Sequence, residues 1–187
     1  LTYMKKTAVF LADGFEEVEA FTQVDLLRRA GIEVKTVSIT ENKEVMGTHG
    51  IKTETDMVFD KAVLENFDGI ILPGGMPGAD NLMKYKPLTD LIIKFNGKGK
   101  MLGAICAAPM IFGQLGILNG KKACSYPGFE KYLTGAEVEF NAVSHDGNII
   151  TSRGVGTAIE FAAEMTEFLL NKETAEKVLE SIVYKKK

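Results

Sequence analysis

Cysteine and histidine are scarce in this chain of 187 residues, which contains two of each. The two cysteines, Cys106 and Cys124, are too few for a disulfide scaffold, and we expect both to be free thiols in a reducing compartment. So few potential ligands at these spacings also argue against a structural zinc site. The sequence therefore predicts a protein without disulfides, without a metal and without a cofactor.

Long apolar runs and an excess of positive charge are missing as well. No apolar stretch reaches the ~18 residues that a membrane-spanning helix needs, and the beginning of the chain does not have the pattern of a secretory signal. The formal net charge of −3 gives no electrostatic reason to expect binding to nucleic acid or to an anionic membrane. We expect a cytoplasmic protein that binds neither.

Strand-like and helix-like patterns alternate along the chain. Short apolar runs predict buried strands, and apolar residues that recur every three or four positions predict helices. The predicted strands cover residues 7–12, 33–39, 69–72, 101–105 and 122–125, and the predicted helices cover 16–30, 88–95, 107–115, 157–170 and 172–183. The polar segment 41–55 predicts a small hairpin, and Asp146-Gly147 predicts a second one between strands at 138–145 and 148–151.

This alternation is typical of a doubly wound α/β domain with a mostly parallel sheet. We expect one domain over residues 1–187, with residues 1–4 and 184–187 as peripheral tails. In such sheets, ligands bind beyond the carboxyl ends of the strands. The candidate site residues come directly after predicted strands.

Cys106 is the strongest candidate for a chemical role. A strand of small and apolar residues leads into it, and Ala107-Ala108-Pro109 follows, which is the strand–turn–helix layout of a nucleophile elbow. A cysteine at the start of a helix has its pKa lowered toward the reactive thiolate. The alternative is a buried structural cysteine, which is common, and it is the interpretation we favour for Cys124.

Three further segments follow predicted strands. The glycines of Leu72-Pro73-Gly74-Gly75 allow a close approach of backbone N–H groups that would stabilise an oxyanion, although a plain turn is the simpler interpretation. Glu16, Glu17 and Glu19 begin the first helix, where acidic residues usually complement the helix dipole. A carboxyl group buried beside a thiol would instead have a raised pKa and donate a proton. Arg153 suits an anionic substrate group or a surface ion pair.

The chain resembles the DJ-1/PfpI superfamily, also called ThiJ-like, and most closely its DJ-1 branch. The resemblance extends from about Lys6 to Glu180 and rests on five motifs in the same order along the chain. These motifs are Ala12-Asp13-Gly14-Phe15-Glu16-Glu17-Val18-Glu19, Val24-Asp25-Leu26-Leu27-Arg28-Arg29-Ala30-Gly31, Leu72-Pro73-Gly74-Gly75, Ala104-Ile105-Cys106-Ala107-Ala108-Pro109 and Thr151-Ser152-Arg153-Gly154-Val155-Gly156-Thr157.

The resemblance implies a flavodoxin-like three-layer α/β sandwich that forms a homodimer. It also implies roles for individual residues. The family's elbow cysteine falls on Cys106, and its protonated glutamate falls on Glu19. The residues implied around them are the backbone donors Gly75 and Ala107 with Gly74 beside them, and the pocket residues Phe15, Tyr126 and Arg153.

The sequence departs from parts of the superfamily in ways that bear on its chemistry. Protease-like and chaperone-glyoxalase branches have a histidine directly after the cysteine, and here that residue is Ala107. Some DJ-1 relatives have a pocket histidine where this chain has Tyr126, and some have an arginine where it has His49. We interpret His49 and His145 as surface residues, which leaves no histidine to pair with Cys106. A Cys–His protease or hydrolase is therefore the weaker hypothesis.

Two functions remain open from the sequence. In the first, Cys106 attacks a reactive carbonyl such as methylglyoxal or its early adduct on a protein, Glu19 moves the proton, and the activity is of the glyoxalase III or deglycase type. In the second, Cys106 is oxidised to a sulfinate under oxidative stress, and the protein acts as a redox sensor or chaperone. Both hypotheses use the same thiol.

Overall fold

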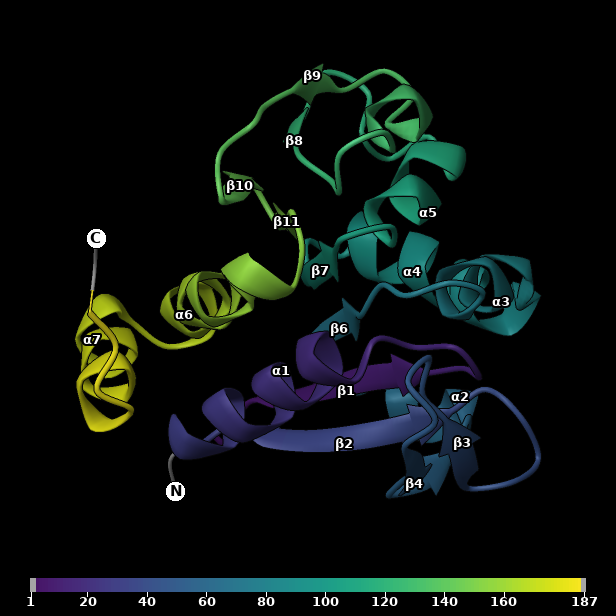
Figure 1. Cartoon of the computed structure of the whole chain (residues 1–187), viewed down its shortest axis with the longest axis horizontal. Coiled ribbons are helices and arrows are strands. Elements are labelled where there is room, and N and C mark those ends of the chain that lie inside the picture. The colour runs from purple at the N-terminus through teal and green to yellow at the C-terminus, as the bar shows by residue number, and fades with distance from the viewer. Residues whose placement is uncertain (1–2, 186–187) are drawn as a thin grey trace.

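The computed structural model describes residues 3–185 and contains a seven-stranded sheet covered by helices on both faces (Figure 1). The strand order is β10-β11-β7-β6-β1-β2-β5, and all neighbouring strands are parallel except the β10–β11 hairpin. The strands are β1 (Lys6–Leu11), β2 (Glu33–Ser38), β5 (Met57–Val58), β6 (Gly69–Leu72), β7 (Met101–Ile105), β10 (Val143–Asp146) and β11 (Ile149–Ser152). The predicted α/β class with a mostly parallel sheet is confirmed.

The side chains of β1 alternate between two apolar layers, as the pleat of a strand requires. Val9 and Leu11 pack under α1 (Glu17–Arg29) and α6 (Ala158–Leu169), and α7 (Lys172–Ser181) packs outside α6. Ala8 and Phe10 face the opposite layer. That layer is covered by α2 (Lys61–Leu64), α3 (Gly78–Lys84), α4 (Lys86–Gly97) and α5 (Pro109–Gln114). The result is the expected three-layer sandwich.

The central strands β6 and β7 are buried along their whole length. Both are therefore continuous apolar runs in the sequence, as expected for parallel strands covered on both faces. Their carboxyl ends lead directly into Pro73-Gly74-Gly75 and into Cys106. Since Leu72 of β6 pairs with Ala104 of β7, the two turns lie side by side at one edge of the sheet.

The predicted small hairpin is present as β3 (Glu44–Met46) and β4 (Lys52–Glu54), which pair antiparallel. The predicted strand 138–145 is wrong in extent. β9 (Glu137–Val138) pairs instead with β8 (Lys122–Ala123), and β10 begins only at Val143. Residues 139–142 between them form a loop in which Phe140 and Ala142 line a cleft, and the Glu139 N–H still donates to the Ala123 carbonyl of β8 at 2.8 Å.

Several short elements have no counterpart in the sequence prediction. They are β5, α2, α3, the 3₁₀ turn η1 (Glu130–Tyr132) and the 3₁₀ turn η2 (Val155–Thr157). Elements of two to seven residues are too short to establish a periodic pattern.

Within residues 3–185, no helix combines the length and apolar character that crossing a membrane would require. Residues 1–2 and 186–187, which belong to the predicted peripheral tails, lie outside the described residues.

Candidate active site

Cys106 occupies the turn directly after β7, and its backbone is in the left-handed region with φ of 65°. A non-glycine residue in this conformation is strained by about 1–3 kcal/mol. Two backbone hydrogen bonds hold it there: the Cys106 N–H donates to the Ser152 carbonyl at 3.0 Å, and the Cys106 carbonyl accepts from the Tyr126 N–H at 2.9 Å. The backbone thus has the geometry expected of a nucleophile elbow.

Gly74 allows the turn after β6 to approach this elbow closely. A Cβ atom added at Gly74 would lie 2.6 Å from Cβ of Cys106 and 2.8 Å from Oε2 of Glu19. No larger residue fits between these two side chains. The site therefore has room only for glycine at position 74.

Glu19 is fully buried on the first turn of α1 and faces the elbow. Its Oε2 accepts a hydrogen bond of 2.8 Å from the Gly74 N–H. Its Oε1 is buried and has no hydrogen-bond partner among the described residues, while the carboxyl group and the Cys106 thiol are close enough to shift each other's pKa. Gly74 therefore positions the carboxyl group, and its N–H is not free to act as an oxyanion donor.

The two acids shift each other's ionisation. Burial, as the main cause, raises the pKa of Glu19 to about 7, although the Gly74 N–H and the Cys106 thiol work in the opposite direction. Burial also raises the pKa of Cys106 to about 12, and the charge of Glu19 and the hydrogen bond with it add to this rise. The backbone N–H groups of Ala107 and Gly75 face the sulfur and lower the pKa.

The sequence predicted a lowered pKa for Cys106. This prediction is wrong when Glu19 beside the thiol is ionised, because the pKa is then raised. The reason is that α5 begins only at Pro109 and burial outweighs the two N–H donors. Two of the causes that raise the pKa of Cys106 require a negative charge on Glu19. The two groups therefore form one coupled pair that shares a proton, and the thiolate is favoured when that proton resides on Glu19.

Cys106 opens into a cleft of about 710 Å³. Tyr126 and Arg153 line it as expected, and Gly75 and Glu19 form its floor with the thiol. Arg153 is held in place because its Nε donates to the Ser125 carbonyl at 3.3 Å. The guanidinium group also lies 5.7 Å from the centre of the Phe140 ring.

Phe15 does not line this cleft, contrary to the expectation. Its side chain is fully buried and packs edge-on against Phe21, with ring centres 5.8 Å apart. The first motif turns inward at this residue because its apolar ring anchors the loop before α1 to the core. Phe15 therefore supports the site from below.

The cleft also contains residues that the sequence analysis did not single out. Phe140 and Val155 line its mouth with large exposed side chains, and Phe140 is 68% exposed. Val155 belongs to the last of the five motifs and Phe140 lies in the predicted strand 138–145, but no sequence signal places either side chain at the cleft. Only the tertiary structure reveals this wall of the cleft.

The three glutamates at the start of α1 have three different roles. Glu16 caps the helix, because its Oε2 accepts from the Glu19 N–H at 2.7 Å. Glu17 is buried and accepts from the His49 backbone N–H at 2.7 Å, with His49 Nδ1 2.8 Å from its other oxygen. Only Glu19 reaches the thiol. The dipole-capping interpretation therefore holds fully for Glu16 alone.

His49 is a surface residue, as the sequence predicted, with a side chain that is 67% exposed, and it also lines the cleft. Hydrogen bonding to Glu17, as the largest cause, raises the pKa of its imidazole. The same contact, against the opposing effect of burial, lowers the pKa of Glu17. Within the described residues, neither His49 nor His145 has a hydrogen bond to Cys106, and His145 contacts Glu164 at 2.7 Å.

Cys124 is buried behind the site and is a free thiol like Cys106. The Thr151 hydroxyl donates to its sulfur at 3.7 Å, and the Cys124 N–H donates to the Thr151 oxygen at 3.0 Å. These contacts agree with the structural role expected for it.

The model of the DJ-1/PfpI family matches residues 5–168 of the chain. Protein DJ-1 homolog B from Arabidopsis thaliana is 42% identical over 176 residues, which are 93% of this chain and 40% of that relative. The chain thus spans less than half the length of this relative. A protein from Pyrococcus horikoshii that is named a deglycase is 32% identical over 166 residues, 88% of this chain and 97% of that protein.

The solved structure of Toxoplasma gondii DJ-1, described as oxidized, superposes with a TM-score of 0.91. It shares 35% sequence identity, and the match covers 97% of this chain and 100% of that structure. The resemblance that the five motifs indicated is therefore confirmed over nearly the whole chain.

Proposed function

Because this chain belongs to the DJ-1/PfpI family, we propose that it is a cysteine-dependent enzyme that acts on reactive carbonyls. Cys106 is the nucleophile and Glu19 is the proton shuttle. The observation that supports this most is the coupled pair itself: a strained, cleft-facing thiol beside a fully buried carboxyl group whose pKa is raised to about 7. An acid with a pKa near neutrality both gives and takes a proton at working pH.

The reaction begins when the Cys106 thiolate attacks the aldehyde carbon of methylglyoxal. A carbon–sulfur bond forms, and the carbonyl oxygen becomes an oxyanion that takes the proton from Glu19, which gives a hemithioacetal. The N–H groups of Gly75 and Ala107, which face the sulfur, stabilise the developing negative charge beside it.

Release of the product requires a proton transfer within the adduct. Glu19, now a carboxylate, removes the proton from the carbon bonded to sulfur, which gives an enediolate, and returns it to the neighbouring carbon. The hydroxyl proton of the hemithioacetal moves to the oxygen of that neighbouring carbon, and the product is the thioester of lactate with Cys106. Water then hydrolyses the thioester to lactate and restores the thiol. The sum is methylglyoxal plus water giving lactic acid, without any change in the net redox state.

The size of the cleft allows larger substrates as well. Its volume of about 710 Å³ lies in the range of pockets for much larger ligands than a three-carbon dicarbonyl. An early methylglyoxal adduct on a protein side chain is a substrate of suitable size, and the Pyrococcus relative carries the name of a deglycase. Deglycation therefore belongs to the same proposal.

The test is lactate formation from methylglyoxal by the purified chain. We expect activity in the parent protein and in Cys124→Ala, and a loss of at least about a thousand-fold in Cys106→Ala, as expected when a covalent nucleophile is removed. Equal rates in the parent and in Cys106→Ala, or no activity in either, would falsify the enzymatic role.

A second candidate function is redox sensing at the same thiol. The observation that favours it is the oxidized state of the structurally similar Toxoplasma protein. Two equivalents of peroxide would convert the Cys106 thiolate to a sulfinate with release of two water molecules, and a protonated Glu19 would donate a hydrogen bond to it. Intact-mass measurements under graded peroxide should show two added oxygens at Cys106 well before Cys124. Equal rates at both cysteines would contradict it.

We further propose that the chain works as a homodimer in a reducing compartment such as the cytoplasm. A reducing environment keeps Cys106 as the free thiol that the mechanism needs. The mass of one chain is 20.4 kDa. Light scattering should therefore give twice this mass in solution, and the mass of a single chain would contradict the dimer.

A further inference from the structure

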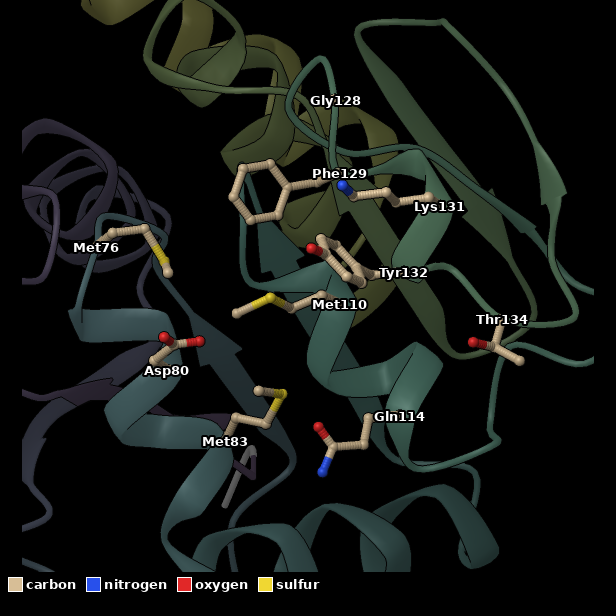
Figure 2. Close-up of a pocket in the computed structure, with 10 residues that line it drawn as sticks. All are labelled: Met76, Asp80, Met83, Met110, Gln114, Gly128, Phe129, Lys131, Tyr132 and Thr134. Atoms are coloured by element: carbon tan, nitrogen blue, oxygen red, sulfur yellow. The ribbon is translucent and has the colours of Figure 1, made fainter.

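A second cavity of about 710 Å³ is lined by residues other than those of the Cys106 cleft. It lies between α3, α5 and the loop that contains η1, as Figure 2 shows, and it is open to solvent on one side, where Gln114, Tyr132 and Thr134 are exposed. No residue lines both cavities, but residues adjacent in the sequence line one cavity and the other. Gly75 lines the cleft and the next residue, Met76, lines the second cavity.

The aromatic side chains connect the two cavities in the same way. Tyr126 lines the cleft, and its ring meets the ring of Phe129 edge-on at 6.4 Å between centres. Phe129 lines the second cavity and contacts Tyr132, with ring centres 5.8 Å apart. The second cavity is thus a separate space that adjoins the cleft through neighbouring residues and contacting rings.

Three methionines from three different segments give this cavity its apolar character. Met76 follows β6, Met83 belongs to α3 and Met110 belongs to α5, and Figure 2 shows all three side chains reaching toward the same space. Phe129 and Tyr132 close it from the η1 side. Unbranched thioethers adapt their shape to different ligands, and methionine-rich surfaces therefore suit apolar ligands of variable shape.

Asp80 is the acidic residue in the lining of this cavity. It is half-buried on α3, and it has no hydrogen-bond or ion-pair partner in the part of the chain that the structure describes. Figure 2 shows its carboxylate on the same side of the cavity as Met76 and Met83. A carboxylate against an apolar wall is screened less by water than one on open surface, so it attracts a cation more strongly.

Lys131 is the basic residue in the lining, and it is placed differently. Its side chain is exposed, and its Nζ lies 5.0 Å from the centre of the Tyr132 ring. Water and the ring therefore already solvate this charge. The half-buried Asp80 dominates the charge preference of the cavity.

We propose that this second cavity binds a small amphipathic amine. The apolar or aromatic body of the ligand packs against Met76, Met83 and Met110, and its protonated amine pairs with Asp80. The volume lies within the range that holds small organic ligands. This proposal does not depend on the chemistry of Cys106.

The experiment uses three probes with one skeleton: 4-phenylbutylamine, 4-phenylbutanol and 4-phenylbutyrate. Each is titrated into protein labelled with ¹³C at the methionine methyl groups. We expect the signals of Met76, Met83 and Met110 to shift, while Met101 and Met165, which are fully buried in the other apolar layer, stay unchanged. The amine should bind about five-fold more tightly than the alcohol, and the carboxylate more weakly still.

Two matched variants separate the charge preference from simple hydrophobic binding. Asp80→Asn should remove the advantage of the amine over the alcohol, whereas Lys131→Gln should keep it. Cys106→Ser should bind the amine as the parent does, because the thiol is in the other cavity. Equal affinity for all three probes, an unchanged preference in Asp80→Asn, or no shift at these methionines would each overturn the proposal.

Discussion

Cys106 and Glu19 are oriented by backbone groups from three different strand ends. The Ser152 carbonyl after β11 holds the cysteine N–H, Gly74 after β6 holds the glutamate, and β7 leads into the cysteine itself. Each contact uses a backbone group of the neighbouring strand end, and the contact at Glu19 joins the Gly74 N–H to a fully buried side chain. The local strain at Cys106 is therefore supported by the central strands of the sheet.

The raised pKa of Glu19 predicts a specific effect of pH on stability. The unfolded carboxyl group ionises near 4.5, while the folded one retains its proton up to about 7. The stabilising contribution is therefore complete below pH 4.5 and is lost as the pH rises to about 7, a change on the order of 3 kcal/mol. Urea unfolding of the parent and of Glu19→Gln across this range measures it.

As the pH rises, the free energy of unfolding of the parent should fall relative to that of Glu19→Gln. A difference that is independent of pH, or one that favours the parent at higher pH, would mean that the buried carboxyl group is not protonated in the folded protein.

Gly74→Ala should damage both stability and the site. The added methyl group would collide with Cys106 and Glu19 at 2.6 and 2.8 Å, and such overpacking costs about 1–3 kcal/mol. Gly97→Ala at the end of α4 is a matched control, because no atom lies within 4 Å of the new methyl group. Denaturant unfolding and alkylation of Cys106 should both change in the first variant only; equal behaviour of the two would contradict the close packing.

At the scale of elements, α1 is tied to the β3–β4 hairpin by Glu17. Its carboxylate accepts from the His49 backbone and faces the His49 ring, and Gly47 lies so close that an added Cβ would collide with Glu17. The hairpin therefore packs over the start of α1, beside the cleft. This contact places His49 at the site, although the sequence separates it from every motif.

This tie predicts how His49 titrates. Because Glu17 raises the pKa of His49, Glu17→Gln should lower it toward the ordinary value of 6.5. Glu16→Gln should lower it less, since Glu16 is only the last of the causes that raise it and lies 3.6 Å from Nδ1. Proton NMR of the imidazole ring measures both changes. The same titration in the parent and in Glu17→Gln would contradict the pairing.

The sign of the corresponding stability effect follows from the raised pKa. The contribution of the His49–Glu17 pair is fully present between about pH 4.5, above which Glu17 is ionised in both states, and pH 6.5. It is lost as the pH rises through the raised pKa of His49 in the folded protein, and again as the pH falls through the lowered pKa of Glu17. Glu19 loses its contribution over a lower range, from about 4.5 to 7. The two groups can therefore be distinguished by the pH at which stability changes.

The sequence predicted the elements with a clear apolar pattern well and those without one poorly, for physical reasons. β6 and β7 are buried on both faces and read as unbroken apolar runs, and α1 has both a regular apolar face and a glycine at its end. In contrast, the loop 139–142 meets the site through a contact distant in sequence, that of Phe140 with Arg153. No local pattern encodes that contact.

At the scale of the whole molecule, the fold brings the motifs together at the carboxyl edge of one sheet. Residues 19, 74, 106 and 153 are far apart in sequence, and the parallel order of β1, β6, β7 and β11 gathers them (Figure 1). Their convergence was predictable from the rule for parallel sheets. The roles of the individual residues at this edge were not predictable. Gly74 orients Glu19, and Phe15 packs in the core.

The central claim is that Cys106 and Glu19 act as one unit on a carbonyl substrate. The most direct test is a double-mutant cycle on lactate formation from methylglyoxal, with the parent, Cys106→Ser, Glu19→Gln and the double variant. We predict that each single variant loses nearly all activity and that the double variant is no worse than Cys106→Ser, because the residues share one proton and one step. Losses that multiply independently, or a Glu19→Gln variant as active as the parent, would contradict this account.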